Sequence, residues 1–189
     1  FHRVPVDRQQ PGRLFEDVKA RFGGLDVLVC VPPAVSQGDI LDIEDGTMRR
    51  VVEDELVLPA VLAREAARHM KPNGSGRIIA FCSMSGKTGV HRRVGPVAAA
   101  KGGLIAFLRV MAAELAPTGV TANAVATALF ESQAEALDEE ERRTIVGGIP
   151  VGRFGRSEEA AHAAVFLASD KAAFITGETL NLSGGRFMD

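Results

Sequence analysis

The sequence has no tyrosine and no tryptophan, and only two of its 189 residues are cysteines. Cys30 and Cys82 follow no spacing that is used for metal ligands, so we expect no metal site. We expect both to be reduced thiols of a cytoplasmic protein. The missing phenol matters as well, because tyrosine is one of the side chains that enzymes use to donate a proton.

Clusters of positive charge are also missing. The formal net charge is −2, and no run of Lys and Arg or interleaving of basic and aromatic residues occurs, which argues against a nucleic-acid surface. The pair Arg92-Arg93 is expected to lie in a solvated loop. No apolar stretch approaches the length of a membrane span, and no signal-peptide pattern opens the chain. We therefore expect neither a nucleic acid nor a membrane as a partner.

What is present is typical of a globular domain. Hydrophobic residues make up 46% of the sequence and charged residues 24%. A chain of this length is enough for one domain with a sizeable core, so we expect residues 1–189 to form a single domain. The chain begins at Phe1, without a Met, inside a segment (2–6) that is typical of a strand. We therefore expect further residues upstream in the natural protein.

Hydrophobic patterns predict alternating helices and strands. Predicted helices cover residues 11–22, 46–70 and 97–116, and predicted strands cover 25–30, 76–84 and 120–126. The strands are short apolar runs between turn signals, as expected of buried parallel strands. A polar loop is expected at 87–93. Pro117 and Gly119 end the last of the three helices.

The second half of the chain carries a distinctive series of motifs. They are Gly76-Arg-Ile-Ile, Ser83, Gly86, Ala98-Ala-Ala-Lys101-Gly-Gly-Leu, Leu115 to Ala126, and the segments 149–159, 164–170 and 175–185. This series closely resembles the short-chain dehydrogenase/reductase family. The resemblance implies an α/β fold with a Rossmann-like, doubly wound parallel sheet. It covers the C-terminal two-thirds of the family domain, so this sequence lacks the first βαβα part and its glycine-rich turn.

The resemblance also implies a chemistry, with one central residue missing. The family uses a Ser and a Tyr-x-x-x-Lys motif to pass a proton while a nicotinamide passes a hydride. Ser83 matches the serine and Lys101 the lysine, but the tyrosine position is Val97. The Asn position of the proton relay is Glu55. The implied activity is that of an oxidoreductase acting on an alcohol or carbonyl, with Ser83 and Lys101 as vestigial catalytic residues.

The positions that would hold the cofactor depart from the family in a similar way. Asp7 matches a residue that holds the adenine, whereas Cys30-Val31-Pro32-Pro33 replaces Asn-Asn-Ala-Gly beside the ribose. Prolines fix φ and remove backbone donors, so this turn cannot copy the glycine-containing one. Thr127-Ala128 replaces Pro-Gly, and Ser132 could still donate a hydroxyl. The implied cofactor is NAD or NADP, held by Asp7, Cys30, Lys101 and Ser132, unless this chain binds none.

Other polar residues have simpler explanations than catalysis. Glu55 and Asp54 point about 100° apart on a helix, so they do not form a paired-carboxylate site. We expect both on a solvated or subunit-facing surface rather than in a catalytic role. His91 precedes Val97 and could donate a proton, but a lone loop histidine is expected to be exposed. A Ser83–Lys101 nucleophilic dyad is disfavoured because the resemblance already explains both residues. The charge run at 139–143 is expected on a solvated helix face.

Three functional hypotheses follow. The first is an oxidoreductase with an altered relay, acting on a small-molecule alcohol or carbonyl. The second is a non-catalytic subunit or binding module that forms a dimer or tetramer through helices 46–70 and 97–116, with itself or an active relative. The third is a lyase similar to halohydrin dehalogenases, which need Ser, Tyr and Arg where this chain has Ser83, Val97 and Lys101. The pattern favours an enzyme-derived protein with little or no hydride transfer.

Overall fold

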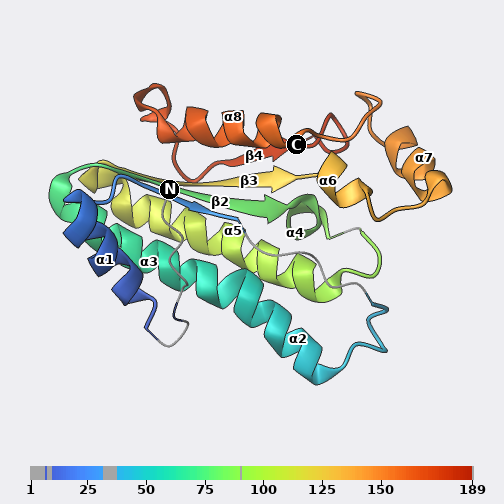
Figure 1. Cartoon of the computed structure of the whole chain (residues 1–189), viewed down its shortest axis with the longest axis horizontal. Helices are drawn as coiled ribbons and strands as arrows, with labels where there is room; N and C mark the ends of the chain where they lie inside the picture. Colours follow the sequence, from blue (N-terminus) through green and yellow to red (C-terminus); the bar gives the residue numbers. More distant parts are fainter. Residues whose placement is uncertain (1–6, 8–9, 32–37, 90, 189) are drawn as a thin grey trace.

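A parallel sheet forms the centre of the computed structural model, which describes residue 7 and residues 10–31, 38–89 and 91–188. Its strands are β1 (Val27–Cys30), β2 (Gly76–Ser83), β3 (Val120–Thr127) and β4 (Thr179–Leu182). They lie in the order β1-β2-β3-β4, all parallel, with helices on both faces (Figure 1). This is the predicted α/β class with a doubly wound parallel sheet.

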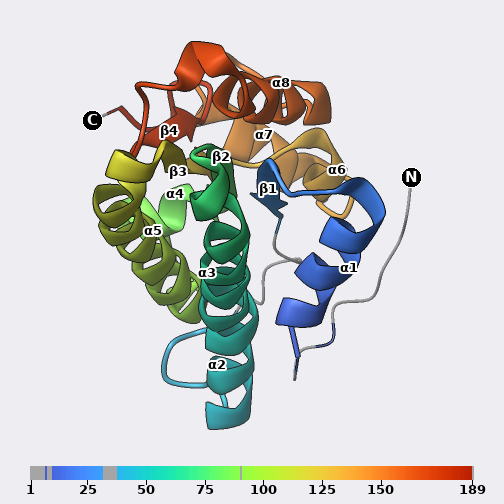
Figure 2. The same cartoon turned by 90° about the vertical axis from the view of Figure 1, so that its left-hand side faces the viewer.

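Two separate cores hold the helices to the sheet. Helices α1 (Gly12–Phe22), α3 (Leu58–Met70) and α5 (Gly95–Leu115) cover one face, and α8 (Ser157–Ala168) covers the other (Figure 2). Side chains alternate between the faces along a strand. Ile78 therefore packs in the core with Met70 and Leu104, while its neighbour Ile79 packs with Leu167 under α8.

An irregular turn interrupts the predicted helix 46–70. Helix α2 (Asp45–Val52) passes through a π-helical turn (Glu53–Val57) into α3. The N–H of Leu58 donates to the carbonyl of Glu53, five residues back. Such a turn holds one more residue than an α-helical turn and changes which side chains face the core. The prediction of one regular helix was therefore wrong at this point.

Short elements gather beyond the carboxyl ends of the strands. Helix α4 (Met84–Thr88) follows β2 and occupies part of the segment predicted as a loop, and α6 (Glu131–Ala134) and α7 (Glu139–Gly147) follow β3. Asp138 accepts hydrogen bonds from the N–H groups of Glu140 and Glu141, which starts α7. The acidic residues 139–141 are exposed, as predicted. Three 3-10 turns (Lys71–Asn73, Ala116–Thr118 and Asp170–Ala172) precede strands or loops.

Strand β1 lies at the edge of the described sheet. It pairs with β2, and Val27 and Val29, which alternate with the core residues Leu28 and Cys30, are 38% and 41% exposed. The segment 2–6, predicted as a strand, lies outside the described residues.

One helical segment of the described residues is both long and strongly apolar. Among the described residues, Gly95–Thr118 is long and apolar enough to cross a membrane, so the statement that no stretch approaches that length was wrong for this helix. However, 50% of its most apolar stretch is buried inside the protein, where α5 packs on the sheet. A core helix gives the same signal, so this is weak evidence for a membrane partner.

Candidate active site

The carboxyl end of β2 and the N-terminal third of α5 meet at the predicted site. Ser83 is the last residue of β2, and Lys101 lies in α5. Gly86 of α4 lies against α5, where an added Cβ atom would be 2.5 Å from Lys101 Cβ and 2.7 Å from Gly102 N. The missing side chain therefore lets the two helices approach, and this approach brings Lys101 to the end of β2.

The ammonium group of Lys101 is buried and already has partners. Its Nζ lies 2.6 Å from Glu55 Oε2 and donates a hydrogen bond of 3.2 Å to the carbonyl of Phe81. The side chains of Lys101 and Glu55 are 6% and 5% exposed. Glu55 Oε2 accepts no regularly aligned hydrogen bond, so charge holds the contact. Each of the two opposite charges, removed from water, is stabilised by the other. The prediction that Glu55 lies on a surface was therefore wrong.

Two local features place Glu55 beside Lys101. The first is the π-helical turn, which contains Glu55 and faces α5. The second is Gly103, where an added Cβ atom would lie 3.0 Å from Leu56 Cδ2. Because Gly103 has no side chain, α5 can pack closely on the turn. The neighbouring Asp54 is partly exposed, so only one of the two carboxylates is buried at this site.

By the resemblance, Val97 lies at the tyrosine position of the Tyr-x-x-x-Lys motif. Its side chain is 2% exposed, one helical turn before Lys101. An aliphatic side chain can neither donate nor accept a proton. Ser83 Oγ accepts a hydrogen bond of 3.1 Å from the N–H of Ser85 and caps α4. The matched serine and lysine therefore both make structural contacts here.

Two of the residues that the resemblance assigns to a nicotinamide cofactor, Lys101 and Cys30, make contacts inside the protein. Lys101, which the resemblance assigns to the ribose, forms an ion pair with Glu55 and donates a hydrogen bond to the carbonyl of Phe81. Cys30 is 8% exposed and packs in the main core. Asp7 and Ser132 have exposed side chains, and Pro32 and Pro33 lie outside the described residues.

The two cysteines lie near the buried ion pair. Burial raises the pKa of Cys30 and of Cys82 to about 11, and the charge of Lys101 opposes that rise in both. Both thiols are free, in line with the expectation of reduced cysteines. In the part of the chain that the structure describes, no group of three or more His, Cys, Asp and Glu side chains could hold a metal ion.

His91 is not the exposed histidine that the sequence predicted. It is partly buried, and its Nδ1 lies 3.2 Å from Ser85 Oγ, two residues after Ser83. Burial lowers the pKa of His91, and the charge of Arg186 lowers it further. Sequence reasoning missed both Ser85 and Arg186. The serine at 85 follows the matched Ser83 closely enough to have indicated a second hydroxyl at the end of β2.

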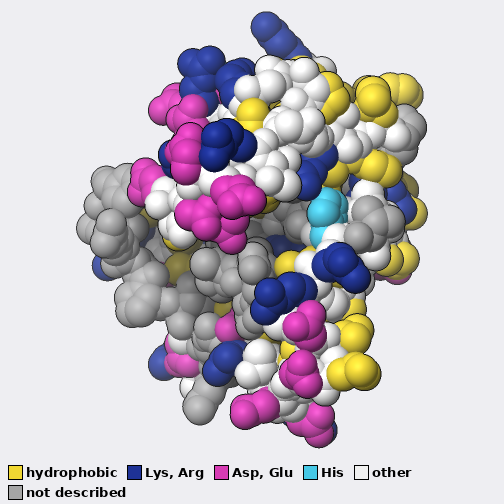
Figure 3. Space-filling model, turned by 90° about the vertical axis from the view of Figure 1, so that its right-hand side faces the viewer, with side chains coloured by type: hydrophobic (Ala, Val, Ile, Leu, Met, Phe, Trp, Pro, Cys, Tyr) yellow, Lys and Arg dark blue, Asp and Glu magenta, His cyan; other side chains and the backbone are white. Residues whose placement is uncertain are grey.

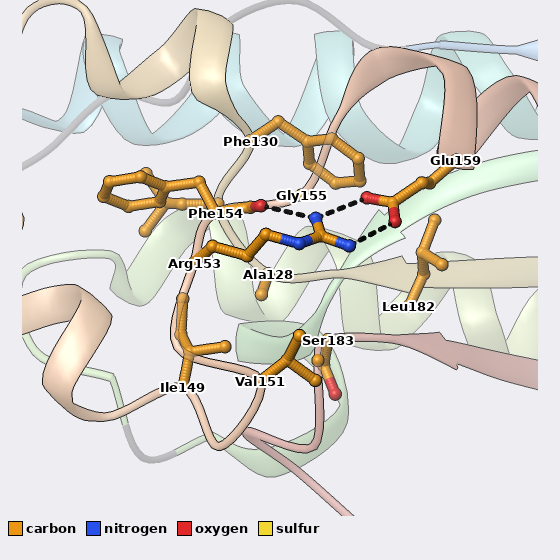
Figure 4. Close-up of a pocket in the computed structure, with 12 residues that line it drawn as sticks. Ala128, Phe130, Ile149, Val151, Arg153, Phe154, Gly155, Glu159, Leu182 and Ser183 are labelled. Atoms are coloured by element: carbon orange, nitrogen blue, oxygen red, sulfur yellow. Dashed lines mark hydrogen bonds and ion pairs between the residues drawn. The ribbon is translucent and has the colours of Figure 1, made fainter.

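A pocket of about 190 Å³ lies beyond the ends of β3 and β4. Apolar side chains, among them Phe130, Ile149 and Phe154, form much of its lining (Figure 4). Arg153 crosses it and makes two hydrogen bonds to Glu159, of 2.9 and 2.6 Å. The hydrogen bond from Arg153 lowers the pKa of Glu159 to about 2. Because these charges satisfy one another, the pocket offers mainly apolar contacts.

Comparisons with known proteins agree with this architecture. A family model described as enoyl-(acyl carrier protein) reductase matches residues 6–186. The chain is 36% identical over 176 residues to 3-oxoacyl-(acyl-carrier-protein) reductase FabG of Escherichia coli (strain K12), an alignment that covers 93% of this chain and 72% of that protein. It is 37% identical to the proteins of the same name from Rickettsia conorii (87% and 68% covered) and Vibrio cholerae (88% and 68% covered).

The chain therefore belongs to the short-chain dehydrogenase/reductase family, and its sheet is the Rossmann-like one that the resemblance implied. Its relatives indicate an NAD(P)-dependent oxidoreductase scaffold.

Proposed function

We propose that this protein is a short-chain dehydrogenase/reductase in which hydride transfer is lost or strongly reduced. The observation that supports the proposal is the Lys101–Glu55 ion pair, with its 2.6 Å separation, buried beside Val97. Reduction of a carbonyl by hydride leaves an alkoxide that must take up a proton. A positioned general acid contributes about 10²–10⁴-fold to such a step, and Val97 supplies none.

The proposed substrate and cofactor follow from the relatives. Several are named for the reduction of 3-oxoacyl groups on acyl carrier protein. A carbonyl compound is therefore the small-molecule substrate to test, with NADPH or NADH. Binding and turnover must be measured separately, because an altered proton relay does not by itself prevent cofactor binding. A cytoplasmic location is proposed with the two free thiols as support.

The test compares two aromatic residues that differ by one hydroxyl. In the full-length protein, Val97→Tyr is combined with Glu55→Asn and assayed for reduction of an acetoacetyl thioester with NADPH. The same double variant with Val97→Phe is the control, because it adds the same ring and the same strain. We expect the Tyr form to be at least about 100-fold faster than the Phe form. Wild-type turnover of about 10 s⁻¹, typical of enzymes, would contradict the proposal.

A specific surface supports a second function, that of a non-catalytic subunit. A groove of about 320 Å³ runs between α3 and α5. Apolar residues of α5 line it, and one of them, Val110, is 60% exposed. We propose pairing of two chains, or of this chain and an active relative, through these helices. Val110→Glu should then lower the oligomeric mass in light scattering, whereas Val151→Glu, 58% exposed elsewhere, should leave it unchanged.

A further inference from the structure

The pocket beyond the ends of β3 and β4 is separate from the predicted catalytic residues. Ser83, Val97 and Lys101 are not among the described residues that line it. The lining comes from three segments, namely the chain after β3 (128–130), the loop and first turn at α8 (149–159) and the end of β4 (182–184). In open parallel sheets, ligands bind outside the carboxyl ends of the strands. The pocket therefore lies where this fold can hold a ligand.

Backbone hydrogen bonds fix the walls of this pocket. The N–H of Glu131 donates to the carbonyl of Gly155 (2.9 Å), and the N–H of Gly155 donates to the carbonyl of Leu129 (3.1 Å). These bonds join the chain after β3 to the loop before α8. The N–H of Val151 donates to the carbonyl of Gly184 (3.1 Å), which joins the same loop to the end of β4. The pocket is therefore formed without a ligand, as small-molecule sites usually are.

The size of the pocket limits what can enter it. Its volume is about 190 Å³, and the buried side chains of Phe130, Ile149 and Phe154 belong to its lining. A cavity of about 150 Å³ lined by Leu, Ile and Phe takes up benzene in another protein. Pockets for drug-sized molecules begin at about 300 Å³. This pocket therefore has room for one six-membered ring with a small substituent.

Arg153 contributes a flat, charged surface to the pocket. Its Nη1 donates to the carbonyl of Phe154 (3.0 Å) and to Glu159 Oε2 (2.9 Å), and its Nη2 donates to Glu159 Oε1 (2.6 Å). Two parallel hydrogen bonds between a guanidinium and a carboxylate lie close to the guanidinium plane. The edge of the group is therefore engaged, and its faces are left for stacking. Figure 4 shows the guanidinium in the middle of the lining residues, and the side chain is 38% exposed, so a ligand can reach it.

The charges around the pocket favour a neutral ligand. Arg153 and Glu159 are the only charged side chains among the described residues that line it, and they compensate one another. Ser183 also lines it, and its Oγ donates to the carbonyl of Phe187 (3.2 Å). The side of the molecule toward which β3 and β4 point carries Asp and Glu as well as Lys and Arg side chains (Figure 3). It therefore presents no field of a single sign that would attract a charged ligand.

We propose that this pocket binds a neutral aryl group, a single six-membered aromatic ring, with the guanidinium of Arg153 stacked on one face of the ring. The face of an aromatic ring attracts a cation, and a planar guanidinium also stacks on it. The apolar walls contribute by removing the ring from water. The site goes beyond the proposed loss of hydride transfer and does not depend on it, because binding needs neither a proton relay nor a cofactor.

The test compares two ring compounds that differ in aromaticity. Phenol and cyclohexanol each have one six-membered carbon ring and one hydroxyl, and each is titrated into the ¹⁵N-labelled full chain. The amides of residues 128–130, 151–155 and 182–184 are followed by NMR. We expect saturable shifts with Kd on the order of millimolar for phenol. Binding of cyclohexanol should be about three- to tenfold weaker, because it has no aromatic face for the guanidinium.

Two variants separate the walls of the pocket from the guanidinium. Ala128→Leu fills the pocket and should weaken phenol and cyclohexanol at least about tenfold each. Ala99→Leu adds the same atoms at an exposed position of α5 and, as the control, should change both Kd values less than about twofold. Arg153→Met keeps an unbranched side chain but removes the planar charge. The preference for phenol should then fall below about twofold.

Several results would overturn the proposal. Equal affinity for phenol and cyclohexanol in the wild type would exclude stacking on Arg153, as would an unchanged preference in Arg153→Met. Equal effects of Ala128→Leu and Ala99→Leu would mean that binding occurs elsewhere, and tighter binding of benzoate than of phenol would overturn the choice of a neutral ligand. Chemical-shift dispersion shows whether each variant is folded. If Arg153→Met is not, the comparison of phenol with cyclohexanol in the wild type still decides. Failure here would leave the proposed function intact, because the titration measures no turnover.

Discussion

Two ion pairs with the same shortest distance differ in almost everything else. The Lys101–Glu55 pair and the Arg153–Glu159 pair both have an N···O separation of 2.6 Å. The first is 6% and 5% exposed, the second 38% and 37%. Lys101 meets its carboxylate as a point charge, whereas Arg153 makes two aligned hydrogen bonds. Distance alone therefore does not describe what an ion pair does.

The difference lies in what each charge would do without its partner. Water can solvate Glu159 or Arg153 if the other is removed, so either side chain has an alternative. Water cannot solvate Lys101 or Glu55 in the same way inside the core, so each charge depends on the other. Mutation of the buried pair should therefore change mainly the free energy of unfolding. Mutation of the exposed pair should change mainly the way in which stability depends on pH.

Removing one member of the buried pair is expected to have the largest effect. Glu55→Leu leaves the Lys101 ammonium without its counter-charge and should lower the free energy of unfolding by about 3–5 kcal/mol. Urea denaturation followed by circular dichroism measures it. The double variant Glu55→Leu/Lys101→Met, which removes both charges, should regain most of that loss. If the double variant is less stable than Glu55→Leu alone, the ion pair is not the reason for the burial of these residues.

A packing change at the same site should come next in size. Gly86→Ala adds a Cβ atom 2.5 Å from Lys101 Cβ and 2.7 Å from backbone. It should destabilise the protein by about 1–3 kcal/mol because α4 and α5 cannot separate without moving Lys101. Gly46→Ala is the control, since that exposed helical glycine has nothing within 4 Å of an added Cβ. The control should stabilise by about 0.5–1 kcal/mol, and the same sign for both variants would contradict the close contact.

The exposed pair should have a smaller effect that depends on pH. The pKa of Glu159 is lowered from 4.5 to about 2, mainly by the hydrogen bond from Arg153. Its stabilisation is therefore complete above pH 4.5 and is lost as the pH falls toward 2. We expect Glu159→Gln to lower Tm at neutral pH, with a difference from the wild type that shrinks across that range. A difference that stays constant in Tm scans down to pH 2 would contradict this assignment.

The two thiols should report on the charge of the buried pair through their reactivity. With pKa values raised to about 11, Cys30 and Cys82 should react with a disulfide reagent at pH 8 far more slowly than free cysteine. The charge of Glu55 raises the pKa of Cys82 in addition to burial. Glu55→Gln should therefore speed labelling of Cys82 more than that of Cys30, as peptide mass spectrometry would show. Equal acceleration would indicate general unfolding instead.

Most of the fold could be predicted from the sequence because buried parallel strands are short, uniformly apolar runs. Strand β2, predicted at 76–84 and found at Gly76–Ser83, is an example. Ser83, Val97 and Lys101 could be matched to the family motif because its spacing is fixed, and their roles stay predictions. The π-helical turn could not, because Val52-Glu-Asp-Glu-Leu56 has the composition of an ordinary helix.

The chemistry of the site depended on contacts between distant segments. Burial of Glu55 is favourable only because Lys101 lies beside it, and that position depends on the close packing at Gly86 and Gly103. In the same way, His91 has a partner because α4 orients Ser85 toward it. The identity of one charged or polar residue in the sequence does not indicate which distant residue it will contact.

The valines of β1 determine how measurements of self-association should be interpreted. Val27 and Val29 are 38% and 41% exposed on the edge strand of the described sheet, and Val31 just beyond is 73% exposed. An apolar edge strand can add a strand from another chain without any evolved interface. In concentrated samples of this 189-residue chain, such strand addition would give large, polydisperse species. A discrete, reversible dimer that survives dilution would instead reflect pairing through α3 and α5.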